Sequence, residues 1–223
     1  MRSIEFLKAG ANCLDLLADH GLSVVQVHDF EEARSRMLAL GKPSITPILS
    51  PDYTDFTEAS GFWFFLTDGE RDLGGTGARF DNIGAESVET YWPRMFRRNY
   101  PSGGGPTTQV PSNSAVQALR GRLIYLGDLY FDSRVRGQRG VLETFVWLLH
   151  MTAALKWEFD WIYAFMRQRD VELGFSVRYG FTRAIPNAQN WLAEHPGRGS
   201  TEYLVMLPQA EFLDGVVRRA LRV

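Results

Sequence analysis

The sequence predicts an α/β protein in which one mixed sheet carries helices on both faces. The order of the expected elements supports this fold class, since a helix-rich start leads to a hairpin and strands then alternate with helices. The helix expected at 140–157 is the second observation, because it is apolar nearly all round and should therefore be buried. A sheet that is partly parallel is typically covered by helices on both faces, which gives an α/β sandwich.

The composition fits one globular domain, 1–223. Of the 223 residues 45% are hydrophobic, and the chain is long enough to bury a full core. The net charge of −2 gives no reason to expect binding to nucleic acid or to an anionic membrane. Cys13 is the only cysteine, so an internal disulfide and a cysteine metal cluster are both excluded. Charged residues inside 1–21 interrupt any secretory apolar core, and we expect a cytoplasmic protein.

The first half of the chain is expected to hold helices and a hairpin. Asp29 suits a helix cap and Gly41 a helix stop, so they bound the second helix. Gly74, Gly75 and Gly77 are interpreted as strand glycines, because no helical run follows them as a dinucleotide-binding loop requires. In order, the expected elements are a helix at 4–17, a strand at 22–30, a helix at 29–40, an irregular segment at 42–56 and a hairpin at 60–81.

The segment at about 85–120 resembles an insertion between two strands. It should begin with a helix at 85–100 that breaks or kinks at Pro93, because proline removes a helical hydrogen bond. A glycine-rich loop follows at 101–106. Inserted loops often cover a site, so this insertion is a candidate lid, and a helical extension is expected at about 1–20.

The second half of the chain alternates strands with helices. The strands are rich in β-branched and aromatic residues, and the last helix is amphipathic. In order, the expected elements are a strand at 121–131, a helix at 140–157, a strand at 159–166, a helix at 169–180, a strand at 201–208 and a helix at 209–223.

A basic loop with two glycines joins the strand at 121–131 to the buried helix. N–H groups at the start of a helix lack partners, and the helix dipole adds positive charge there. Gly137 and Gly140 allow an anion to approach the backbone closely. Full charges come from the arginines of the loop, Arg134, Arg136 and Arg139. The loop therefore suits a pyrophosphate, and the alternative is a solvent-exposed basic loop.

This loop resembles the phosphate loop of the GNAT acyltransferase superfamily, whose motif is Q/R-x-x-G-x-G/A. Arg134 and Gly137 match the first and fourth positions of that motif. The sixth position departs from it, since Arg139 stands there and Gly140 comes one residue late. The order of elements is similar to that of the family over about 61–207.

The resemblance implies a way of binding an acyl donor. In this family the acyl thioester of CoA lies between two splayed strands, and an amine attacks its carbonyl. The loop N–H groups hold the CoA pyrophosphate, the pantetheine pairs with the edge of the preceding strand, and a strand N–H polarises the carbonyl. By this resemblance, the donor-binding positions are Leu129, Phe131, Arg134, Arg136, Gly137, Gln138, Arg139, Gly140 and Val141.

The acid that serves the leaving thiolate in this family is altered here. The family pattern ends in Gly-Phe, which matches Gly180 and Phe181, and its tyrosine then falls on Ser176. A serine hydroxyl is a poor acid, although it can hydrogen-bond to the sulfur. Tyr179 is close in sequence but faces another direction along the helix, and its alternative role is packing against the sheet.

Asp128 interrupts an apolar strand and is the preferred general base. A carboxylate in such a strand is costly unless it is paired or lies at a cleft, and a raised pKa suits a base. Pairing with an arginine is the alternative. Tyr130 shares its strand face by the period of two, and so could contact a substrate. His150 is interpreted as a core histidine, and the other histidines show no metal-ligand spacing with it.

These observations favour an N-acyltransferase that moves an acetyl or other acyl group from acyl-CoA to an amine of a small molecule or peptide. One alternative takes a long acyl chain from an acyl carrier protein, whose acidic surface would suit the arginines of the loop. Another is a non-catalytic module that binds CoA or a partner, which the missing tyrosine and the altered sixth position favour. No metal, nucleic acid or membrane partner is expected.

Overall fold

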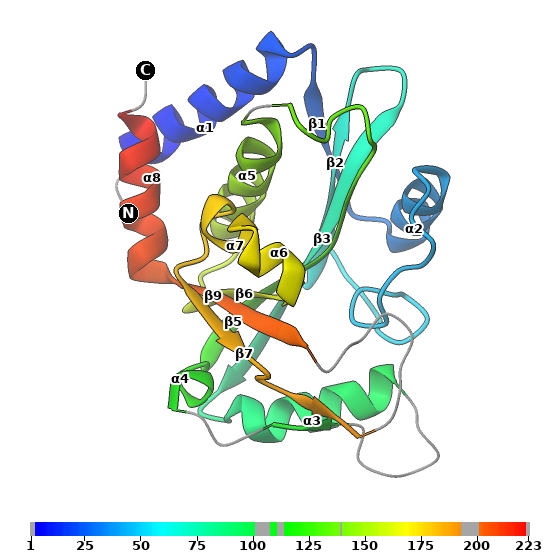
Figure 1. Cartoon of the computed structure of the whole chain (residues 1–223), viewed down its shortest axis with the longest axis vertical. Coiled ribbons are helices and arrows are strands. Elements are labelled where there is room, and N and C mark those ends of the chain that lie inside the picture. Colours follow the sequence, from blue (N-terminus) through cyan, green and yellow to red (C-terminus); the bar gives the residue numbers. More distant parts are fainter. Residues whose placement is uncertain (1–2, 101–107, 111–113, 139, 193–200, 222–223) are drawn as a thin grey trace.

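Seven strands form one mixed sheet, which confirms the predicted fold class (Figure 1). The computed structural model describes residues 3–100, 108–110, 114–138, 140–192 and 201–221. Within the described sheet, β5 and β6 pair in parallel and all other neighbours are antiparallel. The strands lie in the order β1 (Ser23–Val27), β2 (Gly61–Thr67), β3 (Asp72–Gly84), β5 (Gly121–Phe131), β6 (Trp161–Arg167), β9 (Glu202–Pro208) and β7 (Arg183–Pro186).

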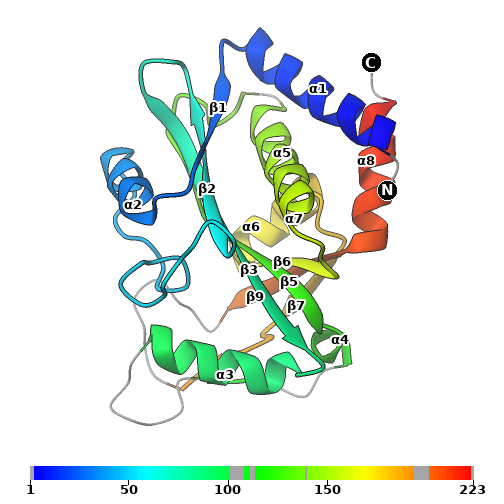
Figure 2. The same ribbon diagram turned by 180° about the vertical axis from the view of Figure 1, so that it is seen from behind.

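Helices cover both faces of the sheet, and each face has its own hydrophobic core (Figures 1 and 2). We call the side that carries α1 (Ser3–Asp19), α5 (Val141–Lys156) and α8 (Gln209–Ala220) the first face. The second face carries α2 (Phe30–Ala39) and α3 (Val88–Asn99). The buried helix predicted at 140–157 is α5, which lies between the sheet and the two terminal helices.

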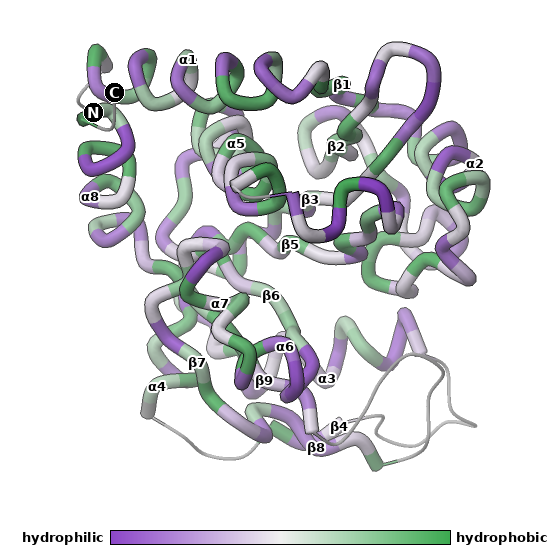
Figure 3. The backbone as a smooth tube through the Cα atoms, turned by 45° about the horizontal axis from the view of Figure 1, so that its top comes forward, coloured by the Kyte–Doolittle hydropathy of each residue, from purple (hydrophilic) through white to green (hydrophobic). Residues whose placement is uncertain are grey.

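The N-terminal helix α1 belongs to the first-face core. Its buried residues recur at spacings of three and four, as in an amphipathic helix, and Figure 3 shows α1 in alternating hydrophobic and hydrophilic bands. The side-chain amide of Asn12 donates to the carbonyl of Arg219 in α8 (3.1 Å), so the helices α1 and α8 lie side by side (Figures 1 and 2). The division of the chain into an extension, a domain and a lid stays a prediction.

Helix α3 continues through Pro93, where the sequence predicts a break or kink. Proline removes one hydrogen bond from the helix. Packing opposes that loss, because Val88, Trp92 and Phe96 are fully buried against the second face of the sheet. Tertiary packing therefore keeps α3 as one helix.

The helix predicted at 169–180 is two short helices, α6 (Gln168–Glu172) and α7 (Phe175–Arg178). Gly174 separates them, because its φ of +79° is left-handed and ends the first helix. Gly174, a glycine inside a helical pattern, was the one feature of the sequence that indicated a break between two helices.

Several short elements were missed, because they are too short to show a hydrophobic period. They are α4 (Ser114–Gln117), the strand β7 of the main sheet, and the small second sheet of β4 (Thr108–Gln109) and β8 (Asn190–Trp191). The loop predicted at 101–106 lies outside the described residues. None of the described helices is both long and apolar enough to cross a membrane.

Candidate active site

Strands β5 and β6 separate after a short parallel contact. Their register joins Leu123–Tyr125 to Trp161–Tyr163 and goes no further, although both strands continue. Beyond that point β6 pairs only with β9 in the described sheet. The edge of β5 that faces β6 is therefore open from Leu126 to Phe131.

A bulge lies in β5 along this open edge. Gly77 of β3 pairs with Gly127 and Gly75 pairs with Tyr130, so Asp128 and Leu129 together face the single residue between those glycines. Asp128 has a φ of 60°, in the left-handed region that few residues other than glycine adopt. The bulge turns backbone groups of β5 away from their regular pairing with β3.

The carboxylate of Asp128 is buried and has partners. Its side chain has no exposed surface, and Oδ1 lies 2.9 Å from Nζ of Lys42. The backbone N–H of Thr46 donates to both carboxylate oxygens at 3.1 Å, and the Thr46 hydroxyl donates to Oδ2 at 2.7 Å. The sequence suggests an arginine as the alternative partner, and the structure instead provides a lysine from the segment after α2. The role of Asp128 as general base stays a prediction.

The loop after β5 presents backbone N–H groups at the start of α5. Gly137 and Gly140 have positive φ values of 94° and 82°, and Gly140 is the residue that precedes the helix. Within the part of the chain that the structure describes, the N–H groups of Gly137, Gly140 and Val141 have no hydrogen-bond acceptor. An anion at the start of α5 would find free donors and the positive end of the helix dipole.

The two described arginines of the loop, Arg134 and Arg136, already have hydrogen-bond partners within the protein. Arg134 is paired with Asp132 through Nε at 2.8 Å and Nη2 at 2.9 Å, and these hydrogen bonds lower the pKa of that carboxyl. Arg136 donates from Nε to the Phe131 carbonyl at 2.8 Å and lies over the Tyr130 ring, without a carboxylate partner in the described chain. Arg139 lies outside the described residues.

The remaining predicted donor positions contribute mainly backbone. Leu129 and Phe131 direct their side chains into the first-face core, which leaves their main chain on the open edge of β5. The side-chain amide of Gln138 donates to the Arg134 carbonyl at 3.1 Å and so holds the turn of the loop. These residues therefore shape a backbone surface rather than a set of side-chain ligands.

Helix α7 and the residue that caps its C-terminal end place Ser176 and Tyr179 in the first-face layer. Both residues are buried, and the Tyr179 ring packs on Phe175 with centroids 5.7 Å apart. Burial, and then the nearby Glu143, raise the pKa of Tyr179 to about 12. Tyr179 thus keeps its proton at neutral pH. The catalytic roles of both residues stay predictions.

His150 lies in the first-face core. It has no exposed surface, both ring nitrogens lack hydrogen-bond partners among the residues that the structure describes, and its ring packs edge-on to Phe181. Burial, and then the charge of Arg219, lower its pKa from 6.5 to about 3. Among the described residues, no group of three or more histidine, cysteine, aspartate or glutamate side chains could hold a metal.

His150→Leu is expected to remove an acid-sensitive contribution to stability. The folded protein keeps His150 neutral, whereas the unfolded chain binds a proton below pH 6.5, so wild-type stability falls as the pH drops from 6.5 towards 3. The slope is about 1.4 kcal/mol per pH unit, which gives a loss of about 2 kcal/mol by pH 5. Denaturant unfolding of both proteins at pH 7.5 and 5 measures it. Equal pH sensitivity of the two proteins would contradict the prediction.

Comparison with known proteins decides the fold. No protein-family model matches this sequence, and no curated protein matches it. The solved structure of NAA60 from Arabidopsis thaliana with acetyl-CoA superposes with a TM-score of 0.50 at 9% identity, over 85% of this chain and 99% of that one. This chain has the GNAT fold.

Other solved structures are also similar to this chain. FeeM, an N-acyl amino acid synthase from uncultured soil microbes, is 12% identical with a TM-score of 0.49, over 86% of this chain and 93% of that one. An acetyltransferase of the GNAT family from Staphylococcus aureus is 11% identical with a TM-score of 0.45, over 84% and 98%.

Sequence reasoning missed Lys42 and Thr46. Both lie in the irregular segment after α2, and no local period marks them as partners of β5. The pairing with Asp128 spans 82 residues of sequence from Thr46. The only signal was the carboxylate itself, because a charge in an apolar strand requires a partner.

Proposed function

We propose that this chain is an N-acyltransferase with an acyl-CoA as donor and an amine as acceptor. The open edge of β5, continuous with the start of α5, carries the proposal. A pantetheine arm can add to that edge as an extra strand, while the pyrophosphate reaches the N–H groups of Gly137, Gly140 and Val141. NAA60, which has the same fold, was solved with acetyl-CoA bound, and this supports the same class of donor.

The chemistry needs an oxyanion site and a path for one proton. The neutral amine attacks the thioester carbon, the C–S bond breaks, and an amide and a thiolate form. The amine nitrogen loses one proton and the thiolate takes one up. A backbone N–H of the bulge at Asp128 and Leu129 stabilises the oxyanion. A thiol has a pKa near ~8.5, so its thiolate leaves without requiring a strong acid.

Calorimetry with CoA and a thiol-release assay test this function. We expect CoA to bind, and thiol release from at least one acyl-CoA to depend on an added amine. Turnover with acyl carrier protein alone would support the carrier alternative, and CoA binding without turnover on any donor would support the non-catalytic module. Absence of both binding and turnover would contradict every form of the proposal.

Ser176→Ala is expected to slow acyl transfer by less than about tenfold. A general acid is typically worth roughly 10²–10⁴-fold, and a serine hydroxyl is too weak an acid to supply that. Tyr179→Phe is the matched comparison, because it removes a hydroxyl at the C-terminal end of the same helix and retains the ring. Steady-state rates per folded molecule decide the point. A thousandfold loss in Ser176→Ala with the fold intact would show that Ser176 has a larger role.

A further inference from the structure

Asp128 lies where the β5 bulge meets the segment between α2 and β2. Each of its oxygens already accepts two hydrogen bonds or ion-pair contacts. Oδ1 contacts Nζ of Lys42 (2.9 Å) and the Thr46 N–H (3.1 Å), and Oδ2 accepts from the Thr46 N–H (3.1 Å) and hydroxyl (2.7 Å). A carboxylate has about four lone-pair sites, so these contacts occupy it. With no exposed surface, Asp128 is badly placed to take a proton from a substrate.

The backbone of Asp128 is also unusual. Its φ of 60° is left-handed, a conformation that aspartate adopts more readily than most residues with a side chain but still at a cost, and surrounding contacts offset that cost here. The contacts to Lys42 and Thr46 are the ones that hold this side chain. They therefore stabilise the bulge, which sets the direction of the N–H groups along the open edge of β5.

The same contacts hold the segment after α2 against the sheet. Arg79 of β3 donates to the Ile48 carbonyl at 3.2 Å, and Ile48 and Leu49 are fully buried in the second-face core. A Cβ at Gly41 would lie 3.5 Å from the Tyr130 hydroxyl, so the segment runs close along the end of β5. It forms a wall of the second face beside the bulge.

We propose that Asp128 is a positioning residue that couples the two sides of the reaction site. Through Lys42 and Thr46 its carboxylate fixes the bulge that receives the thioester and also the wall beside it, on the face from which the acceptor approaches. This inference rests on the proposed acyltransferase function. It replaces a role in proton transfer with a role in geometry.

Four variants distinguish the effect of the left-handed backbone at Asp128 from that of the anchor, by which we mean the contacts of its carboxylate with Lys42 and Thr46. Asp128→Gly keeps the left-handed backbone and removes the anchor, and Asp128→Asn keeps the acceptor for the Thr46 N–H but removes the charge. Lys42→Met removes the ion pair, and Thr46→Val removes the hydroxyl donor but leaves the Thr46 backbone N–H in place. Asp72→Asn is the matched control, because it breaks the Arg36–Asp72 pair (2.8 Å), which joins α2 to β3 on the same face but does not touch the bulge.

We expect Asp128→Gly to lower kcat by about 10- to 100-fold and to raise the KM of the amine, since a misplacement of about 1 Å has this effect. CoA affinity should fall less than kcat, because the pyrophosphate loop is intact and only the contact of the pantetheine arm with β5 is disturbed. Asp128→Asn should retain part of the activity. Adding Lys42→Met to Asp128→Gly should not lower kcat further, because each change removes the same Lys42–Asp128 ion pair. Asp72→Asn should lower the melting temperature and leave kcat and KM unchanged.

Two kinetic outcomes would overturn the proposal. One is a loss of the acid limb of the pH–rate profile in Asp128→Asn with a normal rate in Lys42→Met, which would identify a general base. The other is a lower melting temperature in Asp128→Gly with normal kcat and KM, which would identify a purely structural ion pair.

Hydrogen exchange keeps this test separate from the proposed function. Asp128→Gly should speed amide exchange in both 42–49 and 127–131, and Asp72→Asn should not. If the wild-type protein turned over no donor, the proposed function would fail, and faster exchange in both segments would still establish the anchor. Unchanged exchange in either segment would overturn the coupling, whatever the activity.

Discussion

Replacing Arg136 with glutamate is expected to weaken CoA binding by about 100-fold. Arg136 has no carboxylate partner in the described chain, and its Nε bond to the Phe131 carbonyl (2.8 Å) holds the guanidinium at the end of β5, where the loop begins. Losing a charge-assisted hydrogen bond costs about 1.5–3 kcal/mol, which is about 10- to 100-fold in affinity. The introduced carboxylate also repels the pyrophosphate at the start of α5. Isothermal titration with CoA measures the change.

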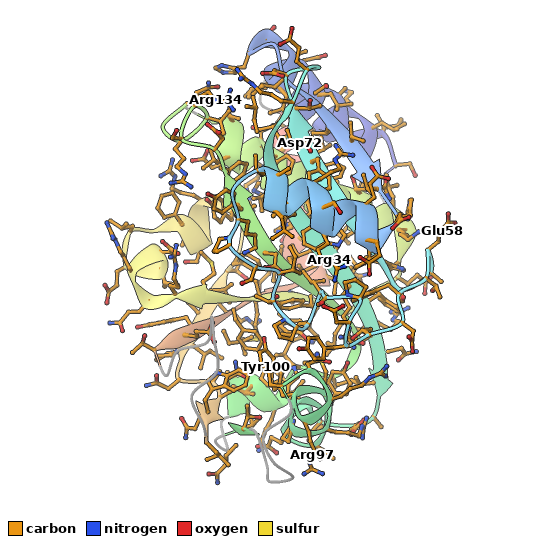
Figure 4. The ribbon with its side chains drawn as sticks, turned by 90° about the vertical axis from the view of Figure 1, so that its right-hand side faces the viewer. Arg34, Glu58, Asp72, Arg97, Tyr100 and Arg134 are labelled. Atoms are coloured by element: carbon orange, nitrogen blue, oxygen red, sulfur yellow. The ribbon has the colours of Figure 1, made fainter. Side chains whose placement is uncertain are left out.

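Arg97→Glu is the matched control for this prediction. It makes the same change in net charge. Figure 4 shows Arg97 at the opposite end of the molecule from Arg134, which marks the loop. CoA affinity should be unchanged in this variant. An equal loss in both variants would mean that net charge, rather than the loop, governs binding. No loss in either would argue against the pyrophosphate site.

Trp92→Ala is expected to lower the free energy of unfolding by about 3–5 kcal/mol, the usual cost of truncating a buried tryptophan. Trp92 is fully buried and joins α3 to the sheet, with ring centroids 5.7 Å from Tyr163 and 5.3 Å from Phe165. Its loss leaves a cavity that the close-packed second face can fill only in part. Denaturant unfolding, followed by circular dichroism, measures the change.

Trp92→Phe should be much less harmful, because it retains an aromatic ring in the same contacts. The pair also tests the predicted lid at 85–120. If α3 opens independently of the domain, Trp92→Ala would change the KM of the acceptor and leave the unfolding midpoint near that of the wild type. A large loss of stability in one cooperative transition would instead mean that α3 is a part of the core.

The regular elements were predictable because their signals are local. Asp29 accepts hydrogen bonds from the N–H groups of Glu31 and Glu32, and α2 therefore begins where its cap predicts. The hairpin of β2 and β3 and the strand β5 were recognised from β-branched and aromatic runs bounded by turn residues. Where a single residue conflicted with its surroundings, as at Pro93 and Gly174, the sequence alone could not decide whether packing or the backbone would prevail.

The sequence by itself determined the fold class, the buried α5 and a glycine-bearing loop at its start, because hydrophobic period and turn chemistry act over a few residues. Tertiary structure alone decided the open edge of β5, which depends on where β6 leaves it for β9. It also decided the partners of Asp128, which come from a segment 82 residues away at Thr46. Strand separation and long-range ion pairs arise from the packing of whole elements, and no local pattern encodes them.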